Sequence, residues 1–198
     1  ITGGSIEERN YTYNDLNQLL AVSGAENTSF IYNPLGEMTS QTKNGVLTNF
    51  GYDRLGRQTN VTEDVNGTNP LTSTYTYYGP SWMRKTAATP QGATQYFYDG
   101  FACIEQITNG TSTKYAVPGQ TPLWERTNGT SLIYTQDGRG NIAGLWNGAS
   151  FDRRFKYDAY GQVKEFNHDW SPVTQKTSGP RYRGQLYDAA TDQVYLRN

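Results

Sequence analysis

The stretch "YNPLGEMTSQTKNGVLTNFGYDRLG", residues 32–56, contains the same phrase twice. Tyr32-Asn33-Pro34-Leu35-Gly36 and Tyr52-Asp53-Arg54-Leu55-Gly56 lie twenty residues apart, with Asn44-Gly45 between them. An Asn or Asp followed three residues later by Gly is typical of a type I turn that ends in a left-handed glycine. Asn-Gly is typical of a two-residue hairpin turn. The stretch therefore predicts two kinds of turn in alternation, with one β-strand in each gap.

Both kinds of turn return along the chain. Further turns of the first kind are predicted at Asp137–Gly140, at Asp158–Gly161 and at Asn14–Asn17, where asparagine replaces the glycine. Further two-residue turns are predicted at Asn66-Gly67, Asn109-Gly110, Asn128-Gly129 and Asn147-Gly148. The gaps hold roughly 6 to 10 residues, which is the length of one strand. One repeat of about twenty residues is thus predicted to be one hairpin.

Aromatic residues occur in pairs separated by one residue, as in Phe30-Ile31-Tyr32 and Tyr96-Phe97-Tyr98. In an extended chain both members of such a pair lie on one face. The chain has 16 Tyr against 7 Phe, only 35% hydrophobic residues and a net charge of -1, which favours an ordered protein whose interior relies on tyrosine. Because a lone hairpin is marginally stable, we expect an all-β fold of consecutive antiparallel hairpins, stacked as a spiral or solenoid or as part of a hollow β-shell.

The repeat assigns structural roles to three groups of residues. The repeat tyrosines are Tyr13, Tyr32, Tyr52, Tyr77, Tyr98, Tyr134, Tyr157 and Tyr187, the acids that follow them are Asp53, Asp99, Asp158 and Asp188, and the turn glycines are Gly36, Gly56, Gly140 and Gly161. Residues 1–166 are predicted to form the hairpin array, and 167–180, with two prolines and no alternation, an irregular loop. We expect these parts and residues 181–198 to form a single continuous domain.

Several functional classes find no support in the residues. The near-zero charge gives no footprint for nucleic acid, and no run approaches the ~18 apolar residues of a membrane span. Cys103 and His168 are the only residues of their types, so we expect no metal, no cofactor and no enzyme activity, with Cys103 buried and His168 solvated. The chain opens at Ile1, so it is expected to be a piece of a longer polypeptide.

The four tryptophans suggest an alternative function. Trp82 and Trp170 lie in irregular stretches, where exposed rings could bind a glycan, as in a surface adhesin or a carbohydrate-binding module. Trp124 and Trp146 lie in strand-like contexts and are expected in the core.

Tyr52-Asp53-Arg54-Leu55-Gly56-Arg57 and its relatives resemble the YD repeat of bacterial Rhs proteins, of the C components of Tc toxins and of teneurins. The resemblance covers nearly the whole chain and includes "YDAYGQV", residues 157–163. The run "RYRGQLYDAATDQVYLRN", residues 181–198, is similar to the beginning of the Rhs repeat-associated core. Asp192 stands where the family usually has glycine, which alters one turn.

The resemblance implies a β-ribbon that winds into a hollow shell enclosing a toxin polypeptide or, in teneurins, a scaffold for adhesion at the cell surface. It therefore implies a protein that is secreted or at the bacterial cell surface. Its partners would be the remainder of the parent polypeptide and an enclosed toxin domain, with self-association through open sheet edges. No residue matches the family's aspartates for self-cleavage, so no catalytic role is carried over.

Overall fold

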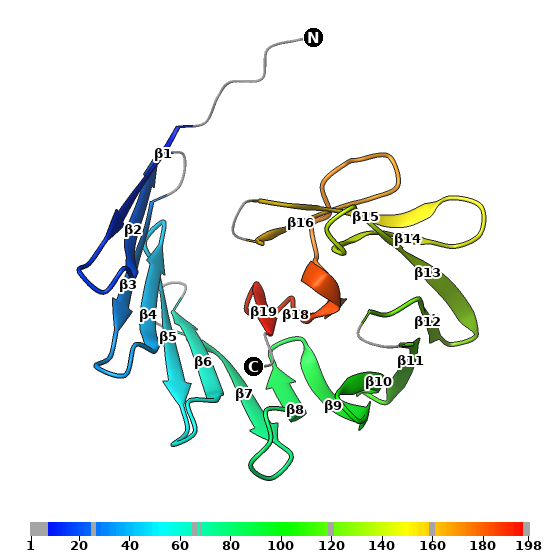
Figure 1. Cartoon of the computed structure of the whole chain (residues 1–198), viewed down its shortest axis with the longest axis horizontal. Coiled ribbons are helices and arrows are strands. Elements are labelled where there is room, and N and C mark those ends of the chain that lie inside the picture. Colours follow the sequence, from blue (N-terminus) through cyan, green and yellow to red (C-terminus); the bar gives the residue numbers. More distant parts are fainter. Residues whose placement is uncertain are drawn as a thin grey trace. The chain divides into compact units, whose positions relative to one another are not determined.

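The computed structural model describes residues 8–24, 27–64, 67, 69–118, 121–158 and 161–195. Contacts divide the chain into a first unit, Ile1–Thr74, and a second unit, Tyr75–Asn198. The predicted fold class is confirmed, because these residues form antiparallel strands and no α-helix (Figure 1). Only one short 3-10 turn, η1 (Tyr182–Gly184), interrupts the strands near the end of the described chain.

The strands of the main sheet are hydrogen-bonded in chain order, and the described residues give sixteen of them. The first seven are β1 (Arg9–Tyr13), β2 (Leu19–Gly24), β3 (Thr28–Tyr32), β4 (Met38–Lys43), β5 (Val46–Tyr52), β6 (Gln58–Asp64) and β7 (Leu71–Tyr77). The next nine are β8 (Arg84–Thr89), β9 (Gly92–Asp99), β10 (Ala102–Thr108), β11 (Thr111–Ala116), β12 (Trp124–Thr127), β13 (Thr130–Gln136), β14 (Ile142–Trp146), β15 (Phe151–Tyr157) and β16 (Val163–Phe166). A second sheet pairs β17 (Gly179–Pro180), β18 (Leu186–Asp188) and β19 (Gln193–Tyr195).

Turns of the first kind share one hydrogen-bond pattern. At Asn33 the side-chain Oδ1 accepts the backbone N–H groups of Leu35 (3.0 Å) and Glu37 (2.9 Å), and the Gly36 N–H donates to the Asn33 carbonyl. The same bonds close the turns that begin at Asn14, Asp53 and Asp137. The fourth residue has a left-handed backbone in each case, with φ of 85° at Gly36 and 59° at Asn17. The side chain that starts the turn thus satisfies the backbone that it bends.

The two-residue turns agree with the prediction at three of the five sites. Asn44, Asn109 and Asn128 have φ of 49–50° and are each followed by a left-handed glycine. The prediction at Asn147-Gly148 is wrong, because Trp146 pairs with Phe151 and the loop between them holds four residues. There the Asn147 Oδ1 caps two backbone N–H groups, which favours the longer loop. Asn66 lies outside the described residues.

The two aromatic residues of a repeat have different environments. The first member is buried at Phe50 (7% exposed) and Phe155 (4% exposed), whereas Phe30 is half-buried. The second member is less buried and uses its hydroxyl: Tyr32 donates to the Leu19 carbonyl at 3.0 Å. In the same way, the Tyr52 hydroxyl donates to the Met38 carbonyl and the Tyr157 hydroxyl donates to the Ile142 carbonyl. Each acceptor lies two residues after the glycine that ends the preceding turn of the first kind. These bonds give the interior phenols hydrogen-bond partners and couple successive hairpins.

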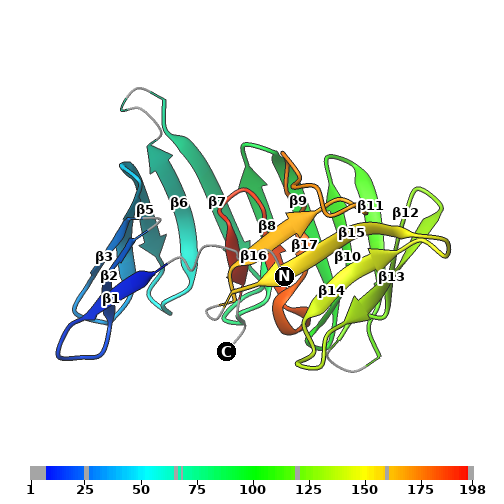
Figure 2. The same cartoon turned by 90° about the horizontal axis from the view of Figure 1, so that it is seen from above.

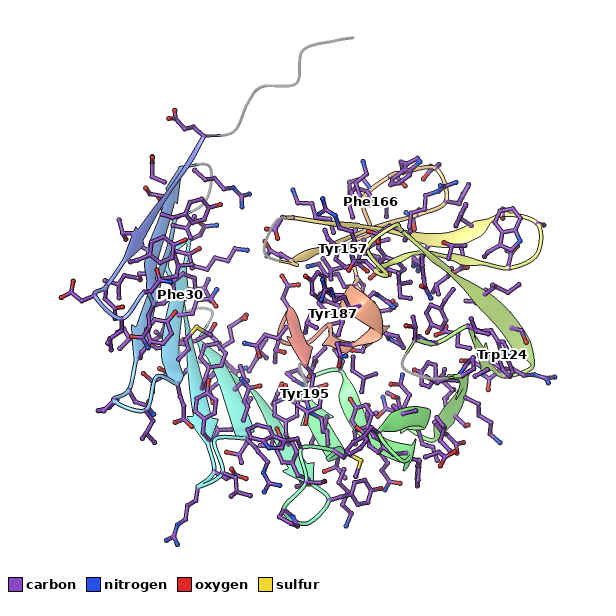
Figure 3. The ribbon with its side chains drawn as sticks, in the orientation of Figure 1. Phe30, Trp124, Tyr157, Phe166, Tyr187 and Tyr195 are labelled. Carbon is purple, nitrogen blue, oxygen red and sulfur yellow. The ribbon has the colours of Figure 1, made fainter. Side chains whose placement is uncertain are left out.

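The second unit has its own core. Strands β8 to β16 curve around the stretch of chain from β17 to β19, which we call the C-terminal segment, residues 179–195 (Figure 1). Figure 2 shows β14, β15 and β16 side by side, as their pairing requires. Figure 3 shows Tyr187 among the side chains that lie between the strands and the C-terminal segment. The curvature therefore gives the second unit an inner face on which this segment packs.

Candidate functional site

The inner face of the second unit is built from aromatic residues of alternate strands. Their rings are buried, with 3–7% exposure, and they come from β7, β9, β11, β13 and β15 in turn: Tyr75, Tyr96, Tyr115, Tyr134 and Phe155. Burial raises the pKa of Tyr96 to about 12 and raises the pKa of the Tyr115 and Tyr134 phenols, which are therefore neutral at physiological pH. The inner face presents apolar rings with hydroxyl groups, and the C-terminal segment lies against it.

The first contact between this face and the C-terminal segment is a buried ion pair. A guanidinium nitrogen of Arg84, on β8, donates to Asp188 Oδ2, on β18, at 3.3 Å, and the side chains are 5% and 9% exposed. The Tyr75 hydroxyl donates to the same oxygen at 2.9 Å. The guanidinium carbon of Arg84 lies 3.8 Å from the Tyr75 ring centroid and 4.4 Å from that of Tyr195. The carboxylate thus receives two donors, and the cation lies over two rings.

The second contact is Arg181, which is 1% exposed and is the largest fully buried side chain. Its guanidinium carbon lies 4.1 Å from the Phe155 ring centroid. Its terminal nitrogens donate to the Thr177 carbonyl at 3.0 Å, the Thr177 hydroxyl at 2.8 Å and the Pro180 carbonyl at 2.8 Å. The backbone carbonyl of Arg181 accepts the Ile142 N–H, which joins the segment to β14. Arg181 therefore holds its own loop together while it packs on the sheet.

The third contact is the buried Glu165 on β16, whose side chain has no exposed surface. Its two carboxylate oxygens accept the N–H and the hydroxyl of Thr177, each at 3.0 Å. Arg153 Nε lies 3.2 Å from the same carboxylate. Thr177 thus connects Glu165 to Arg181 and ties the loop before the C-terminal segment to the sheet.

A fourth polar group, Glu125 on β12, is half-buried on the inner face. The Tyr134 hydroxyl donates to Glu125 Oε2. Burial raises the pKa of the Glu125 carboxyl above its ordinary value, although the Tyr134 bond and the nearby Arg181 charge act in the opposite direction. In the folded protein this carboxyl therefore binds a proton more readily than in the unfolded chain.

A raised carboxyl pKa has a defined effect on stability. The stabilising contribution of Glu125 is fully present below the pKa of about 4.3 that this carboxyl has in the unfolded chain. It is lost as pH rises through the pKa of the carboxyl in the folded protein, because the folded state must then hold a buried charge. We expect Glu125→Gln to remove this part of the pH dependence and to be relatively more stable near pH 7 than near pH 4. Denaturant titrations of both proteins at each pH measure the difference in unfolding free energy between them. The other carboxyls are present in both proteins, so their effects cancel in this difference. A stability difference that does not change with pH would contradict the assignment.

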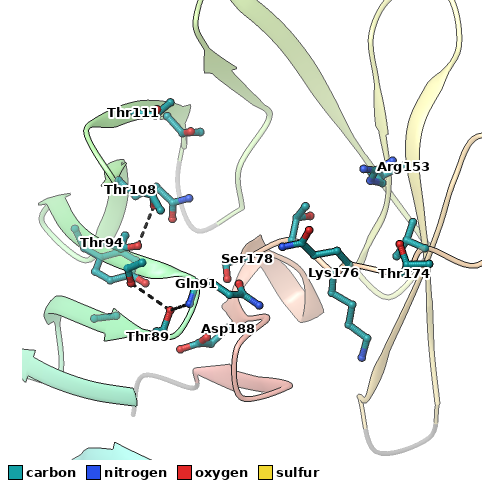
Figure 4. A pocket seen from close by; sticks show the side chains of 18 of the residues that line it. Thr89, Gln91, Thr94, Thr108, Thr111, Arg153, Thr174, Lys176, Ser178 and Asp188 are labelled. Carbon is teal, nitrogen blue, oxygen red and sulfur yellow. Dashed lines mark hydrogen bonds between the residues drawn. The ribbon is translucent and has the colours of Figure 1, made fainter. Parts of the chain in front are cut away.

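A cavity of about 640 Å³ lies between β8–β11 and the loop before the C-terminal segment (Figure 4). Hydroxyl and amide side chains line most of it, and Thr94 and Thr108 share a hydrogen bond of 2.9 Å across neighbouring strands. Figure 4 shows Lys176 across the cavity from Thr94 and Thr108, and Asp188 beside Thr89. Asp188 is already bound by Arg84 and Tyr75, so the cavity offers mainly neutral hydrogen-bonding groups.

The structure divides the repeat residues named from the sequence between the two units. The hairpins of the first unit contain Tyr13, Tyr32, Gly36, Tyr52, Asp53 and Gly56. The second unit contains the others: Tyr77, Tyr98, Asp99, Tyr134, Gly140, Tyr157, Asp158, Gly161, Tyr187 and Asp188. Of these, Tyr134, Tyr187 and Asp188 are buried at the inner face or in the segment that covers it. The pattern alone does not indicate Arg84, Glu125, Glu165 or Arg181.

Two repeat acids, Asp99 and Asp188, do not begin a turn of the first kind. Asp99 pairs with Ala102, so only Gly100 and Phe101 form that turn. Asp188 lies in a strand and caps the Ala190 N–H with one oxygen, while its other oxygen binds Arg84. Asp192, at the place of the family's glycine, has a left-handed φ of 55°, as a turn glycine would.

The tryptophans differ in exposure. Trp170 is 45% exposed, whereas Trp82 is half-buried and its carbonyl accepts the Tyr195 hydroxyl. The core prediction for Trp124 is wrong, because this residue is 39% exposed on the short strand β12. Trp146 is half-buried and contacts Phe151 edge-on, with ring centroids 5.1 Å apart.

Other features bear on ligands and membranes. Among the described residues, no group of three or more His, Cys, Asp and Glu side chains could hold a metal ion. Cys103 is buried, and its Sγ donates to the Glu105 carbonyl at 3.6 Å. His168 is exposed. The part of the chain that the structure describes contains no helix long and apolar enough to cross a bilayer.

Comparisons with known proteins give likenesses to solved structures only. No protein-family model matches the chain, and no curated protein matches its sequence. Among solved structures, a Tc holotoxin pore of Photorhabdus luminescens aligns with 93% of this chain at 11% identity and a TM-score of 0.45. The chain spans 13% of the length of that protein. At this level of similarity the alignment by itself assigns neither a fold nor a function.

Proposed function

We propose that this chain is a non-enzymatic structural segment of a YD-repeat shell, whose inner face holds another stretch of polypeptide. The observation that carries the proposal is the C-terminal segment, which already lies on the inner face of the second unit. The face holds it through the buried Arg84–Asp188 pair, the Tyr195–Trp82 bond and the Arg181–Phe155 contact. Its groups are those that bind a polypeptide: phenols, carboxylates and guanidinium groups at fixed positions along successive hairpins.

The organisation of the sheet supports the same proposal. Each hairpin is joined to the next by hydrogen bonds, so length can be added without changing the repeat. Among the described residues, β1 and β16 are the two ends of the strand order, which is where a longer array would continue. A secreted or surface-located parent protein and an enclosed toxin domain belong to this proposal through the resemblance of the repeats.

Protease protection of the parent polypeptide tests the proposal. If the chain encloses a linked polypeptide, that polypeptide should resist trypsin while the hairpins are folded and become cleavable once denaturant unfolds them. The matched control is the linked polypeptide expressed without the hairpins, which should be cleaved at once. Equal cleavage rates with and without the folded hairpins would reject enclosure, even if the fragment itself is stable.

The second candidate function, a carbohydrate-binding module, is favoured by one observation, the exposed indole of Trp170. Trp82 does not support it, because its ring is half-buried and its carbonyl is bound by Tyr195. Of the two tryptophans that the sequence suggested for a glycan site, Trp170 is therefore the one that the structure leaves accessible.

A further inference from the structure

Residues 167–171, within the predicted irregular loop, share the two backbone hydrogen bonds of the repeat turns. The Asn167 N–H donates to the Ser171 carbonyl at 2.9 Å, and the Trp170 N–H donates to the Asn167 carbonyl at 3.1 Å. The equivalent bonds at Asn33 connect Glu37 and Gly36. Trp170 thus occupies the position where the other described turns of this kind have glycine or asparagine.

Trp170 adopts the left-handed backbone that this position requires, with φ of 67°. This conformation is unfavourable for an L-residue, and it is a rare outlier for a bulky side chain. The other described non-glycine residues in this region are Asn, Asp and Arg183. Strain of this kind is retained where the surroundings or a function require it, so the placement of the ring needs a reason.

The surroundings of the ring are cationic. The guanidinium carbon of Arg154 lies 4.9 Å from the Trp170 ring centroid, and Lys156 Nζ lies 4.6 Å from it. Phe166 lies beside the indole, with ring centroids 5.6 Å apart. Arg154 and Lys156 alternate along β15 with the buried Phe155, so they project from the face opposite the inner face.

The charges beside the Trp170 ring are of one sign. Lys164 on β16 pairs directly with Lys156, and like charges in this arrangement are unfavourable. In the part of the chain that the structure describes, no carboxylate forms an ion pair with Arg154, Lys156 or Lys164. The neighbouring Asp169 carboxylate instead accepts the Ser171 N–H and hydroxyl. Two positive charges, those of Arg154 and Lys156, therefore lie beside one exposed indole, and the Lys164 charge is on the strand that pairs with Lys156.

We infer that Trp170, with Arg154, Lys156 and Lys164, forms a binding site for an acidic saccharide. The flat C–H face of a sugar ring can pack on the indole, and its carboxylate can pair with the cations. Three cations on two strands, in a chain of net charge -1, are too few for the basic stripe that nucleic acid requires. The inference deepens the carbohydrate-binding alternative and is independent of the shell proposal.

Calorimetric titration of the full chain tests the site with two matched pairs of probes. One pair is tetragalacturonate and its methyl ester, and the other is sialyllactose and lactose, so that uronic and sialic acids are distinguished. We expect at least one acidic probe to bind about tenfold or more tightly than its neutral counterpart, with affinity that falls as salt rises. Equal binding of neutral and acidic probes would overturn the acidic class but leave the carbohydrate alternative. Absence of saccharide binding would overturn both.

Variants place the site. Trp170→Gly should keep or raise the thermal midpoint, because glycine adopts the left-handed backbone freely, while binding falls about tenfold or more. The double variant Lys156→Gln with Lys164→Gln should weaken binding of the acidic probe and remove most of the salt dependence of that binding. The matched controls are Trp124→Ala, another exposed indole, and Lys114→Gln on β11, which should bind like the unchanged protein. Unchanged binding in Trp170→Gly, or binding only to duplex DNA or anionic vesicles, would overturn the inference.

Discussion

Replacing Asp188 by alanine is expected to lower the free energy of unfolding by about 3–5 kcal/mol, which is the usual cost of breaking a buried ion pair from one side. The Arg84 side chain is only 5% exposed, so it would keep its charge without the carboxylate that accepts its hydrogen bond. The Tyr75 hydroxyl would lose its acceptor in the same step. Urea denaturation followed by tyrosine and tryptophan fluorescence measures the change.

Two further variants show whether this loss belongs to the pair. Lys176 and Asp192 form an ion pair whose side chains are 33% and 39% exposed, so Lys176→Ala should cost at most about 1 kcal/mol. The double variant Arg84→Met with Asp188→Leu removes both charges and should recover much of the lost stability. If Asp188→Ala is no more harmful than Lys176→Ala, Arg84 is not stabilised by this carboxylate.

The turns and hairpins are predictable because their causes are local. The five residues from Asn33 to Glu37 contain the capping side chain, the groups that it caps and the glycine that accepts φ of 85°. The failure at Asn147-Gly148 is equally local, since the Asn147 side chain caps Ala149 and Ser150 and so favours a longer loop. The turn at Asn167 has the spacing of the repeat turns, but the sequence pattern does not predict it because tryptophan stands at the glycine position.

The inner face is not predictable in the same way, because its contacts join distant parts of the chain. Arg84 and Asp188 are 104 residues apart in sequence, and no local pattern links them. The phrase Tyr187-Asp188 suggests another turn acid, yet the strand that contains it packs against β7 and β8 through Tyr75 and Arg84. The pattern also cannot tell which aromatic residue of a pair is buried, since both share a face of the strand. Burial depends on the segment that covers them.

Replacing Arg181 by alanine is expected to cost a similar amount, about 2–5 kcal/mol, because it empties the space of the largest fully buried side chain. The Thr177 and Pro180 carbonyls would lose their donors, and the Phe155 ring would lose the guanidinium at 4.1 Å. Thermal and urea denaturation measure the loss. Arg183→Ala, two residues away and exposed, is the matched control and should change stability by less than about 0.5 kcal/mol.

Arg181→Met separates packing from hydrogen bonding at the same position. Methionine restores most of the apolar volume but leaves the Thr177 carbonyl without its donor, which costs about 1–3 kcal/mol for a buried acceptor. The expected order of stability is therefore Arg183→Ala, then Arg181→Met, then Arg181→Ala. No carboxylate among the described residues lies within ion-pair distance of Arg181, so removal of its charge alone should be tolerated. If methionine is as harmful as alanine, the polar contacts of the guanidinium, rather than the volume that it fills, account for the loss of stability.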